Sequence, residues 1–239
     1  MDVWDRGSIY FRVCSVVLGI MANIVLLVSI FAYSSKSLKT YRILITAIAV
    51  TDVTYCLSIG FGLARQMFFT TRIAIIFNGP CVYLGLDACI LAHGVWIHGI
   101  EHSVNLIWIS FVYRYIVLTN YTVTRTKLIL VISVIHIPSI IQIGFLPLSL
   151  EPNLTSTPEV VAFENIADGR RFAHVFTKAL PDLFLSYSLV YATVPTYFLF
   201  PVVFVIRNKI LVLLNDPRAN LSQKTRRIHK MLMTVGVCY

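Results

Sequence analysis

Long apolar stretches alternate with short polar connections along this chain. A helix of about 20 apolar residues crosses the ~30 Å hydrocarbon core of a bilayer. Five stretches reach that length, and they cover residues 9–33, 43–64, 82–116, 128–148 and 184–206. A sixth begins at residue 228 and is still apolar at residue 239, the last of the sequence. The pattern predicts an all-α, polytopic membrane protein that forms a single helical domain.

The third stretch is the longest, and the other spans are arranged relative to it. Residues 79–118 begin with Gly-Pro and continue as a nearly unbroken apolar run. Some 35 helical residues would reach about 50 Å, so this helix must tilt or project from the membrane. Its end reads Tyr113-Arg114-Tyr115, and aromatic rings beside a guanidinium favour the membrane–water interface.

Composition supports the membrane class. Of the 239 residues, 57% are hydrophobic and only 13% are charged, and the mean hydropathy is +0.79. Soluble domains carry about a quarter charged residues, and no polar segment here is long enough to build a core of its own. The net charge of +9 lies in short loops, which indicates membrane topology rather than a nucleic-acid partner. The lipid bilayer is the expected surrounding.

Basic residues predict the orientation of the spans. Thirteen of the 20 Lys and Arg residues lie in residues 34–42, 113–127 and 207–230, the connections on one side of the membrane. Because Lys and Arg favour the cytoplasmic side, the N-terminus is predicted outside. Residues 65–78 and 149–183 then form outer loops, and residues 207–227 form a cytoplasmic one.

Three sequons match the N-glycosylation pattern. The sequon at Asn153 lies in the outer loop, where glycosylation occurs. Those at Asn120 and Asn220 fall on the cytoplasmic side and are rejected as acceptors.

Two polar residues lie in the middle of predicted spans, Asn23 in the first and Asp52 in the second. An ionisable group inside a membrane is a functional hypothesis by default. The alternative is structural, since each side chain can satisfy a polar group of a neighbouring helix.

The third stretch carries further ionisable groups. His93, Glu101 and His102 are expected to line the bundle interior, where they face a ligand or pair with one another. Asp87 lies near the outer end, where a ligand arriving from outside would meet it or where water would hydrate it.

One motif suggests a catalytic metal. His98, Glu101 and His102 match the H-x-x-E-H pattern of a zinc peptidase. So short a match arises easily by chance, and neither a third ligand nor a water route is indicated. The five cysteines also lack metal-ligand spacing. We therefore predict no enzyme activity, no metal and no cofactor.

Four segments carry a family resemblance. They are residues 36–44 (KSLKTYRIL), 79–85 (GPCVYLG), 110–118 (SFVYRYIVL) and 225–230 (TRRIHK). With them the chain resembles the nematode serpentine chemoreceptors of class delta (Srd), a family of seven-transmembrane G-protein-coupled receptors. The resemblance implies a truncated seven-transmembrane bundle, with five full spans and the start of a sixth.

The resemblance also implies a function. The chain would be a G-protein-coupled chemosensory, olfactory-type receptor in the plasma or ciliary membrane of sensory neurons. Its partners would be a small-molecule odorant or other chemosensory ligand and a heterotrimeric G protein. The implied coupling switch comprises Tyr113, Arg114, Tyr115, Arg226, Arg227 and Lys230. The simpler alternatives are that Arg114 anchors the topology and that the basic strip attracts anionic lipid.

The chain departs from the pattern of rhodopsin-like receptors at two positions. In those receptors a Cys at the top of span three pairs with one in the second outer loop, but residues 151–182 contain no Cys. Cys81 is therefore expected to have no partner there. Tyr113 also replaces the acidic neighbour of the Arg. Two other functions stay open: a transporter or channel component, which would have paired, broken helices, and an inactive receptor fragment.

Overall fold

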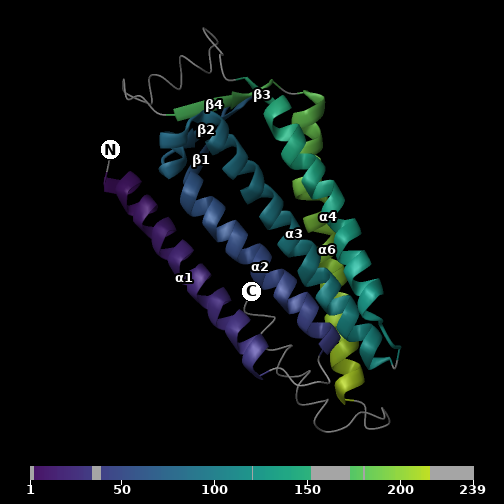
Figure 1. Cartoon of the computed structure of the whole chain (residues 1–239). Coiled ribbons are helices and arrows are strands. Elements are labelled where there is room, and N and C mark those ends of the chain that lie inside the picture. Colours follow the sequence, from purple (N-terminus) through teal and green to yellow (C-terminus); the bar gives the residue numbers. More distant parts are fainter. Residues whose placement is uncertain (1–2, 34–38, 120, 152–172, 180, 216–239) are drawn as a thin grey trace.

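The structure is a computed structural model that describes residues 3–33, 39–119, 121–151, 173–179 and 181–215. In this part of the chain long helices lie side by side, and a small sheet covers one end of them (Figure 1). We call this end the sheet end, and the opposite one the Arg114 end. The sixth apolar stretch lies outside the described residues.

Each of the five long apolar stretches forms a helix. They are α1 (Val3–Tyr33), α2 (Lys39–Gly62), α3 (Leu86–Leu118), α4 (Arg125–Leu148) and α6 (Leu183–Asn215). The class predicted from hydropathy, a helical membrane protein, is confirmed. Helix α6 continues past residue 206, where the span was predicted to end, into the expected loop. Its last turns are helical since Ile210 and Leu214 are fully buried in a cluster with Phe111 and Leu118 of α3.

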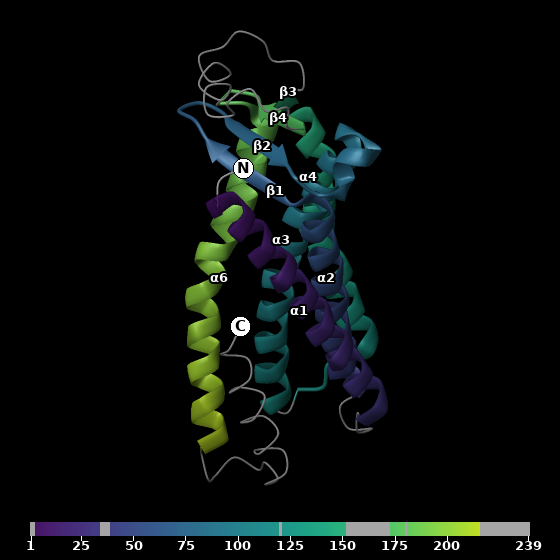
Figure 2. The same cartoon turned by 90° about the vertical axis from the view of Figure 1, so that its left-hand side faces the viewer.

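Helix α3 is enclosed by the others. It packs against α2, α4 and α6, whereas α1 packs against α2 (Figures 1 and 2). Within the described residues, α1, α2, α4 and α6 are the helices long and apolar enough to cross a membrane. Although α3 has 33 residues, it is not among them. Its buried positions include His93, Glu101, His102, Ser110 and Arg114, which explains why it needs protein on several sides.

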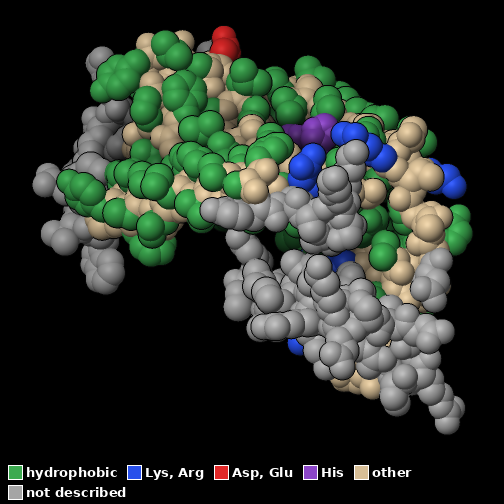
Figure 3. All heavy atoms as spheres, turned by 60° about the horizontal axis from the view of Figure 1, so that its bottom comes forward, with side chains coloured by type: hydrophobic (Ala, Val, Ile, Leu, Met, Phe, Trp, Pro, Cys, Tyr) green, Lys and Arg blue, Asp and Glu red, His purple; other side chains and the backbone are tan. Residues whose placement is uncertain are grey.

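The flanks of the bundle are apolar. Hydrophobic side chains cover much of the surface in Figure 3, whereas Lys and Arg side chains gather toward the Arg114 end. Exposed residues such as Val17, Val131 and Phe200 belong to helices α1, α4 and α6. An apolar surface of this kind is matched to lipid rather than to water.

Two glycines let α3 approach its neighbours. A Cβ added at Gly99 would lie 2.9 Å from the Cβ of Tyr55 on α2, and one at Gly94 would lie 3.4 Å from a methyl group of Leu146 on α4. Small residues at helix contacts allow the close packing on which membrane bundles depend. Gly99 therefore sets the distance between α2 and α3.

A four-stranded antiparallel sheet, which the sequence analysis did not anticipate, joins the two predicted outer loops. Its strands are β1 (Ala64–Phe68), β2 (Ile73–Phe77), β3 (Leu150–Glu151) and β4 (Ala173–Thr177), in the order β1-β2-β4-β3. Alternate residues point to opposite faces of a sheet. Ile75, Phe77 and Val175 pack toward the helices with Leu146, while the opposite face carries a second cluster.

Polar contacts hold the sheet together where the loops meet. Arg72 donates to Glu151 at 2.5 Å and to the backbone oxygen of Thr177 at 3.1 Å. The hydroxyl of Thr177 accepts from the backbone N–H of Ile73 at 3.0 Å. One basic residue in the first loop thus fixes the positions of β3 and β4.

The start of α3 differs from the prediction. A 3₁₀ turn occupies Pro80–Leu84, and the helix begins at Leu86 rather than at residue 82. Gly85 separates the two with φ = 102°, a conformation that side chains disfavour. At Gly79 a Cβ would lie 2.2 Å from the backbone oxygen of Phe61, so only glycine lets the chain pass the end of α2.

A disulfide joins the 3₁₀ turn to α3. Cys81 bonds to Cys89, eight residues along the chain, and both are fully buried. Cys81 was expected to have no partner in the second outer loop, and the structure instead pairs it with Cys89, a partner that the sequence analysis did not anticipate. The backbone reversal at Gly85 brings the two cysteines together. The bond ties the first loop to the helix it precedes.

The packing of α2 on α3 can be tested with two glycine substitutions. Gly99→Ala should lower the free energy of unfolding by about 1–3 kcal/mol, because the added methyl group meets Tyr55. Gly144→Ala in α4 is the matched control, since a Cβ there has nothing within 4 Å and alanine favours the helix. Thermal melting of both variants in detergent micelles measures the difference. Equal melting temperatures would contradict the close approach at Gly99.

Candidate functional site

The end of α3 holds Arg114 inside the bundle. Its side chain is 7% exposed. Nε donates to the hydroxyl of Tyr41 at 2.9 Å, and a second guanidinium nitrogen contacts the same hydroxyl. The guanidinium carbon also lies 5.3 Å from the ring centre of Tyr41 and 5.5 Å from that of Phe111, within the range of cation–π attraction. Arg114 thus connects the ends of α2 and α3.

The residues of α3 next to Arg114 contact two different helices, α2 and α6. The Tyr113 ring stacks on that of Tyr41 with centres 5.7 Å apart, and the Tyr41 hydroxyl lies 3.3 Å from Oγ of Ser110. Tyr115 instead packs against the cluster that joins α3 to α6. Of the implied coupling residues, Tyr113, Arg114 and Tyr115 are therefore in one place but on different sides of α3. Arg226, Arg227 and Lys230 lie outside the described residues.

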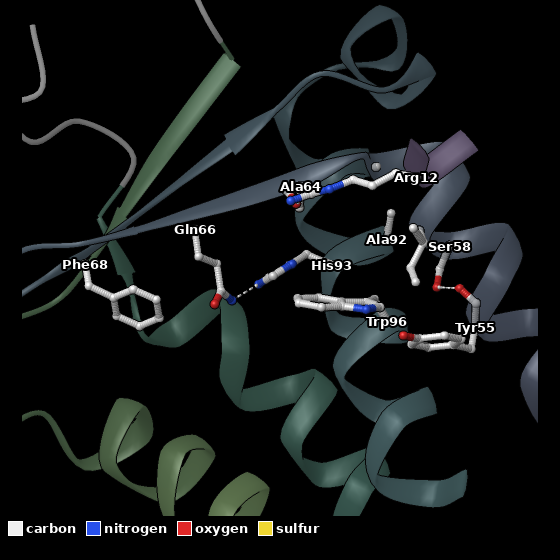
Figure 4. A pocket seen from close by; sticks show the side chains of 11 residues that line it. Arg12, Tyr55, Ser58, Ala64, Gln66, Phe68, Ala92, His93 and Trp96 are labelled. Atoms are coloured by element: carbon white, nitrogen blue, oxygen red, sulfur yellow. Dashed lines mark hydrogen bonds between the residues drawn. The ribbon is translucent and has the colours of Figure 1, made fainter. Parts of the chain in front are cut away.

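A pocket opens at the sheet end between β1, α2 and α3 (Figure 4). Its volume is about 400 Å³, which suits a small molecule. Its lining residues are Arg12, Tyr55, Ser58, Ile59, Gly62, Ala64, Gln66, Phe68, Ala92, His93 and Trp96. Four of these side chains carry aromatic rings, and Figure 4 shows Trp96 between His93 and Tyr55.

Several polar atoms in the pocket have capacity for a ligand. Nδ1 of His93 and Nε1 of Trp96 are buried without a hydrogen-bond partner. Nε2 of His93 lies 3.4 Å from Nε2 of Gln66. Arg12 donates to the backbone oxygen of Ala64 at 2.6 Å, which accounts for one of its five N–H groups. The pocket therefore combines aromatic surface with several hydrogen-bond donors.

The other candidates in α3 lie elsewhere. His102 contacts His136 of α4, with ring nitrogens 2.8 Å apart, and His98 lies against both rings. Glu101 faces Gln142 of α4. Although His136 adds a third imidazole to the H-x-x-E-H motif, no group of His, Cys, Asp or Glu among the described residues is arranged to hold a metal ion.

The remaining polar candidates are separate from one another. Asp52 accepts a hydrogen bond from Ser103 of α3 at 2.7 Å. Asn23 donates to the backbone oxygen of Gly19 in its own helix, and its side-chain oxygen has no partner. The structure therefore does not join Asn23 and Asp52 by a hydrogen bond. Asp87 is exposed in the first turn of α3, outside the lining of the pocket.

Comparison with protein families identifies the chain. Residues 8–235 match the family described as "Serpentine type 7TM GPCR chemoreceptor Srd". The chain belongs to the Srd family. Srd proteins are chemoreceptors of the seven-transmembrane class, a receptor family rather than an enzyme family. This match confirms the resemblance that the four sequence segments indicate, and with the apolar helices it makes the chain an integral, multi-pass membrane protein.

Three Srd relatives from Caenorhabditis elegans are similar over most of the chain. "Serpentine receptor class delta-19" is 29% identical and "Serpentine receptor class delta-18" is 28% identical, each over 90% of this chain. "Serpentine receptor class delta-1" is 24% identical over 92% of it. The chain spans 65% of the length of the first two relatives and 61% of the third.

Sequence reasoning missed the partners of several Srd candidate residues. Tyr41 is part of the segment 36–44 that supports the resemblance, but nothing in that segment shows that its hydroxyl reaches Arg114, 73 residues away. His136 and Gln66 likewise come from other elements than the α3 residues they contact. An aromatic residue near the same end of a neighbouring span was the available signal for Tyr41.

The hydrogen bond between Tyr41 and Arg114 predicts that a variant without the Tyr41 hydroxyl is less stable. Tyr41→Phe removes the hydroxyl that accepts from the guanidinium but keeps the ring. A hydrogen bond to a charged group contributes about 1.5–3 kcal/mol, so the variant should unfold at a lower temperature. Tyr197→Phe is the control, since Tyr197 is 78% exposed on α6. If melting in detergent shows the two variants to be equally stable, Tyr41 does not hold Arg114.

Proposed function

We propose that this chain is part of a chemosensory, olfactory-type receptor that couples to a heterotrimeric G protein. A small organic ligand binds the pocket at the sheet end. Its binding changes the packing around α3, and the Arg114 end responds by exposing a surface for the G protein. Arg114, Tyr113 and Tyr115 belong to that surface together with Arg226, Arg227 and Lys230.

The main support for this proposal is that α2 and α3 build both the pocket at the sheet end and the cluster around Arg114. α3 contributes His93 and Trp96 to the pocket and Arg114 to the cluster at its other end. α2 contributes Tyr55 to the pocket and Tyr41 to the cluster. The two places are about 30 Å apart along α3. A ligand that moves one helix against the other would therefore strain the contact between Tyr41 and Arg114.

The pocket favours a particular kind of ligand. Its aromatic side chains suit a flat, unsaturated ring, because rings stack or pack edge to face. Arg12 and the indole N–H of Trp96 are donors, so they suit an acceptor group such as a carboxylate or a carbonyl oxygen. We therefore infer that the ligand is a small aromatic acid, aldehyde or ketone. Asp87, Glu101 and His102 lie outside the lining of this pocket.

The transporter alternative finds less support. It requires discontinuous helices whose ends line a binding site. Pro138 lies inside α4, and Pro195 and Pro201 lie inside α6, yet both helices are continuous through these residues. A receptor whose helices pivot on α3 fits these observations better.

The receptor proposal includes an orientation, with the N-terminus outside, in the plasma or ciliary membrane of sensory neurons. Its support is the charge distribution, since Lys and Arg side chains gather toward the Arg114 end (Figure 3). Basic residues favour the cytoplasmic face. The sheet end and the pocket then face outward.

A signalling assay tests the proposed function. Cells that express the full chain, a broadly coupling G protein and a calcium reporter are exposed to benzoate, cinnamate and benzaldehyde, with benzylammonium as the ligand of opposite charge. The anionic and carbonyl compounds should activate. Trp96→Ala should raise the half-maximal concentration at least about tenfold through lost ring contacts, and Arg114→Gln should abolish the response.

Surface labelling of an N-terminal tag normalises each variant for expression, and Tyr197→Phe serves as the control that keeps the response. A full response from Arg114→Gln would contradict coupling through this residue. An equal response to benzylammonium would contradict the inferred ligand class. A chain that reaches the surface but never signals would favour the inactive-fragment alternative.

Glycosylation tests the orientation. Asn153 lies outside the described residues, but its sequon belongs to the predicted outer loop. The expressed chain should lose apparent mass on treatment with a glycosidase, and Asn153→Gln should remove that shift. Asn120→Gln and Asn220→Gln should leave it unchanged. A glycan at Asn120 or Asn220 would reverse the topology and place Arg114 outside the cell.

A further inference from the structure

The 3₁₀ turn that precedes α3 exposes three consecutive hydrophobic side chains. Val82 is 40% exposed, Tyr83 is 92% exposed and Leu84 is 73% exposed. We call these three residues the exposed turn. A run of exposed apolar residues of this length is unfavourable in water unless it serves a function. The packing of the described residues therefore does not explain these side chains.

The chain on both sides of the exposed turn is fixed. Cys81 and Cys89 are fully buried, and their disulfide joins the turn to α3. The backbone N–H of Val82 donates to the oxygen of Gly79 at 3.2 Å, and that of Gly85 donates to the oxygen of Val82 at 3.4 Å. The exposed side chains thus stand on an anchored backbone that holds them away from the core.

The exposed turn lies at the side of the bundle. In Figure 2 the 3₁₀ turn is the short blue coil that projects sideways, lower than the sheet. Helices α2 and α4 end at the same end of the bundle, at Gly62 and Leu148, and both are long and apolar enough to cross a membrane. The exposed turn therefore borders the lipid at the level where these spans end.

Two residues of α3 indicate how deep the exposed turn lies. Asp87 is exposed in the first turn of the helix, and a carboxylate is far more stable beside water or headgroups than in hydrocarbon. Leu91, which is 59% exposed, follows one turn later and about 6 Å deeper. An exposed acid beside the turn and an exposed aliphatic residue below it indicate the membrane–water interface. Tyrosine favours this layer, because its ring is apolar and its hydroxyl is polar.

We propose that the exposed turn inserts into the interfacial layer of the bilayer at the sheet end. Its partner is the lipid, with the Tyr83 ring at the depth of the headgroups and with Val82 and Leu84 against the upper part of the acyl chains. Lipid is the occupant because the apolar flanks of the bundle already face it. Since the disulfide ties the turn to α3 at Cys89, this contact fixes the depth of the helix segment that lines the aromatic pocket. The proposal does not rest on the proposed function.

Fluorescence quenching of a tryptophan in the exposed turn tests its depth. The full chain with Tyr83→Trp is reconstituted in nanodiscs that hold one copy each. The lipid carries a nitroxide either on its headgroup or at the end of an acyl chain, and iodide is the aqueous quencher. The signal of the original chain, which contains Trp4, Trp96 and Trp108, is subtracted. The headgroup nitroxide should quench the added tryptophan at least about twofold more than the acyl-end nitroxide does, and iodide should quench it weakly.

Two further variants support this measurement. Leu84→Trp is a second reporter should Tyr83→Trp fail to fold, and it should show the same preference for the headgroup nitroxide. Tyr197→Trp is the matched control, since Tyr197 is 78% exposed but lies about 20 Å along α6 from Leu183, the first residue of that helix. In this control the acyl-end nitroxide should be the stronger quencher. Thermal melting of each variant verifies that it is folded.

Three results would overturn the proposal. Strong quenching by iodide, with little by either nitroxide, would place the exposed turn in water. Stronger quenching by the acyl-end nitroxide would place it in the hydrocarbon core. Weak quenching by all three probes would mean that another part of the chain covers the turn, since the nanodisc contains no second copy. None of these results bears on ligand binding in the aromatic pocket, so this proposal and the proposed function fail independently.

Discussion

The central constraint on this protein is the polar character of α3. A helix that buries Glu101, His102 and Arg114 cannot face lipid at these positions, because hydrocarbon offers no hydrogen bonds. The helix must be enclosed by protein, and α2, α4 and α6 enclose it. These helices have apolar flanks on the outside, while they present residues such as Tyr41 and Gln142 to α3. The arrangement of the bundle follows from shielding one helix.

The two ends of α3 are held by different kinds of contact. At the sheet end the disulfide between Cys81 and Cys89, the close passage at Gly79 and the paired strands of both loops join the helix to its surroundings. At the Arg114 end hydrogen bonds and ring contacts from Tyr41 hold it. Covalent and strand contacts resist small displacements more than a single phenol does. Movement between α2 and α3 is therefore expected to concentrate at the Arg114 end.

The parts of this structure that sequence could predict are those that a bilayer imposes locally. A span must have about 20 apolar residues, so the helices at residues 9–33 and 128–148 follow from hydropathy alone. The sheet could not be found this way, because its strands have at most five residues and Ala74 pairs with Phe176, about a hundred residues away. The disulfide depends in turn on the reversal at Gly85. Contacts between distant segments leave no periodic pattern in a single sequence.

The two acids inside the membrane show most clearly where sequence reasoning ends. Asp52 and Glu101 both read as isolated carboxylates in apolar stretches, and the pattern around them assigns both to the same class of hypothesis. In the structure Asp52 of α2 receives a hydrogen bond from Ser103 of α3, whereas Glu101 of α3 faces Gln142 of α4. The first acid is satisfied by a neighbouring helix and needs nothing further. The second lies against a different helix, and this difference depends on what each neighbouring helix places opposite the acid.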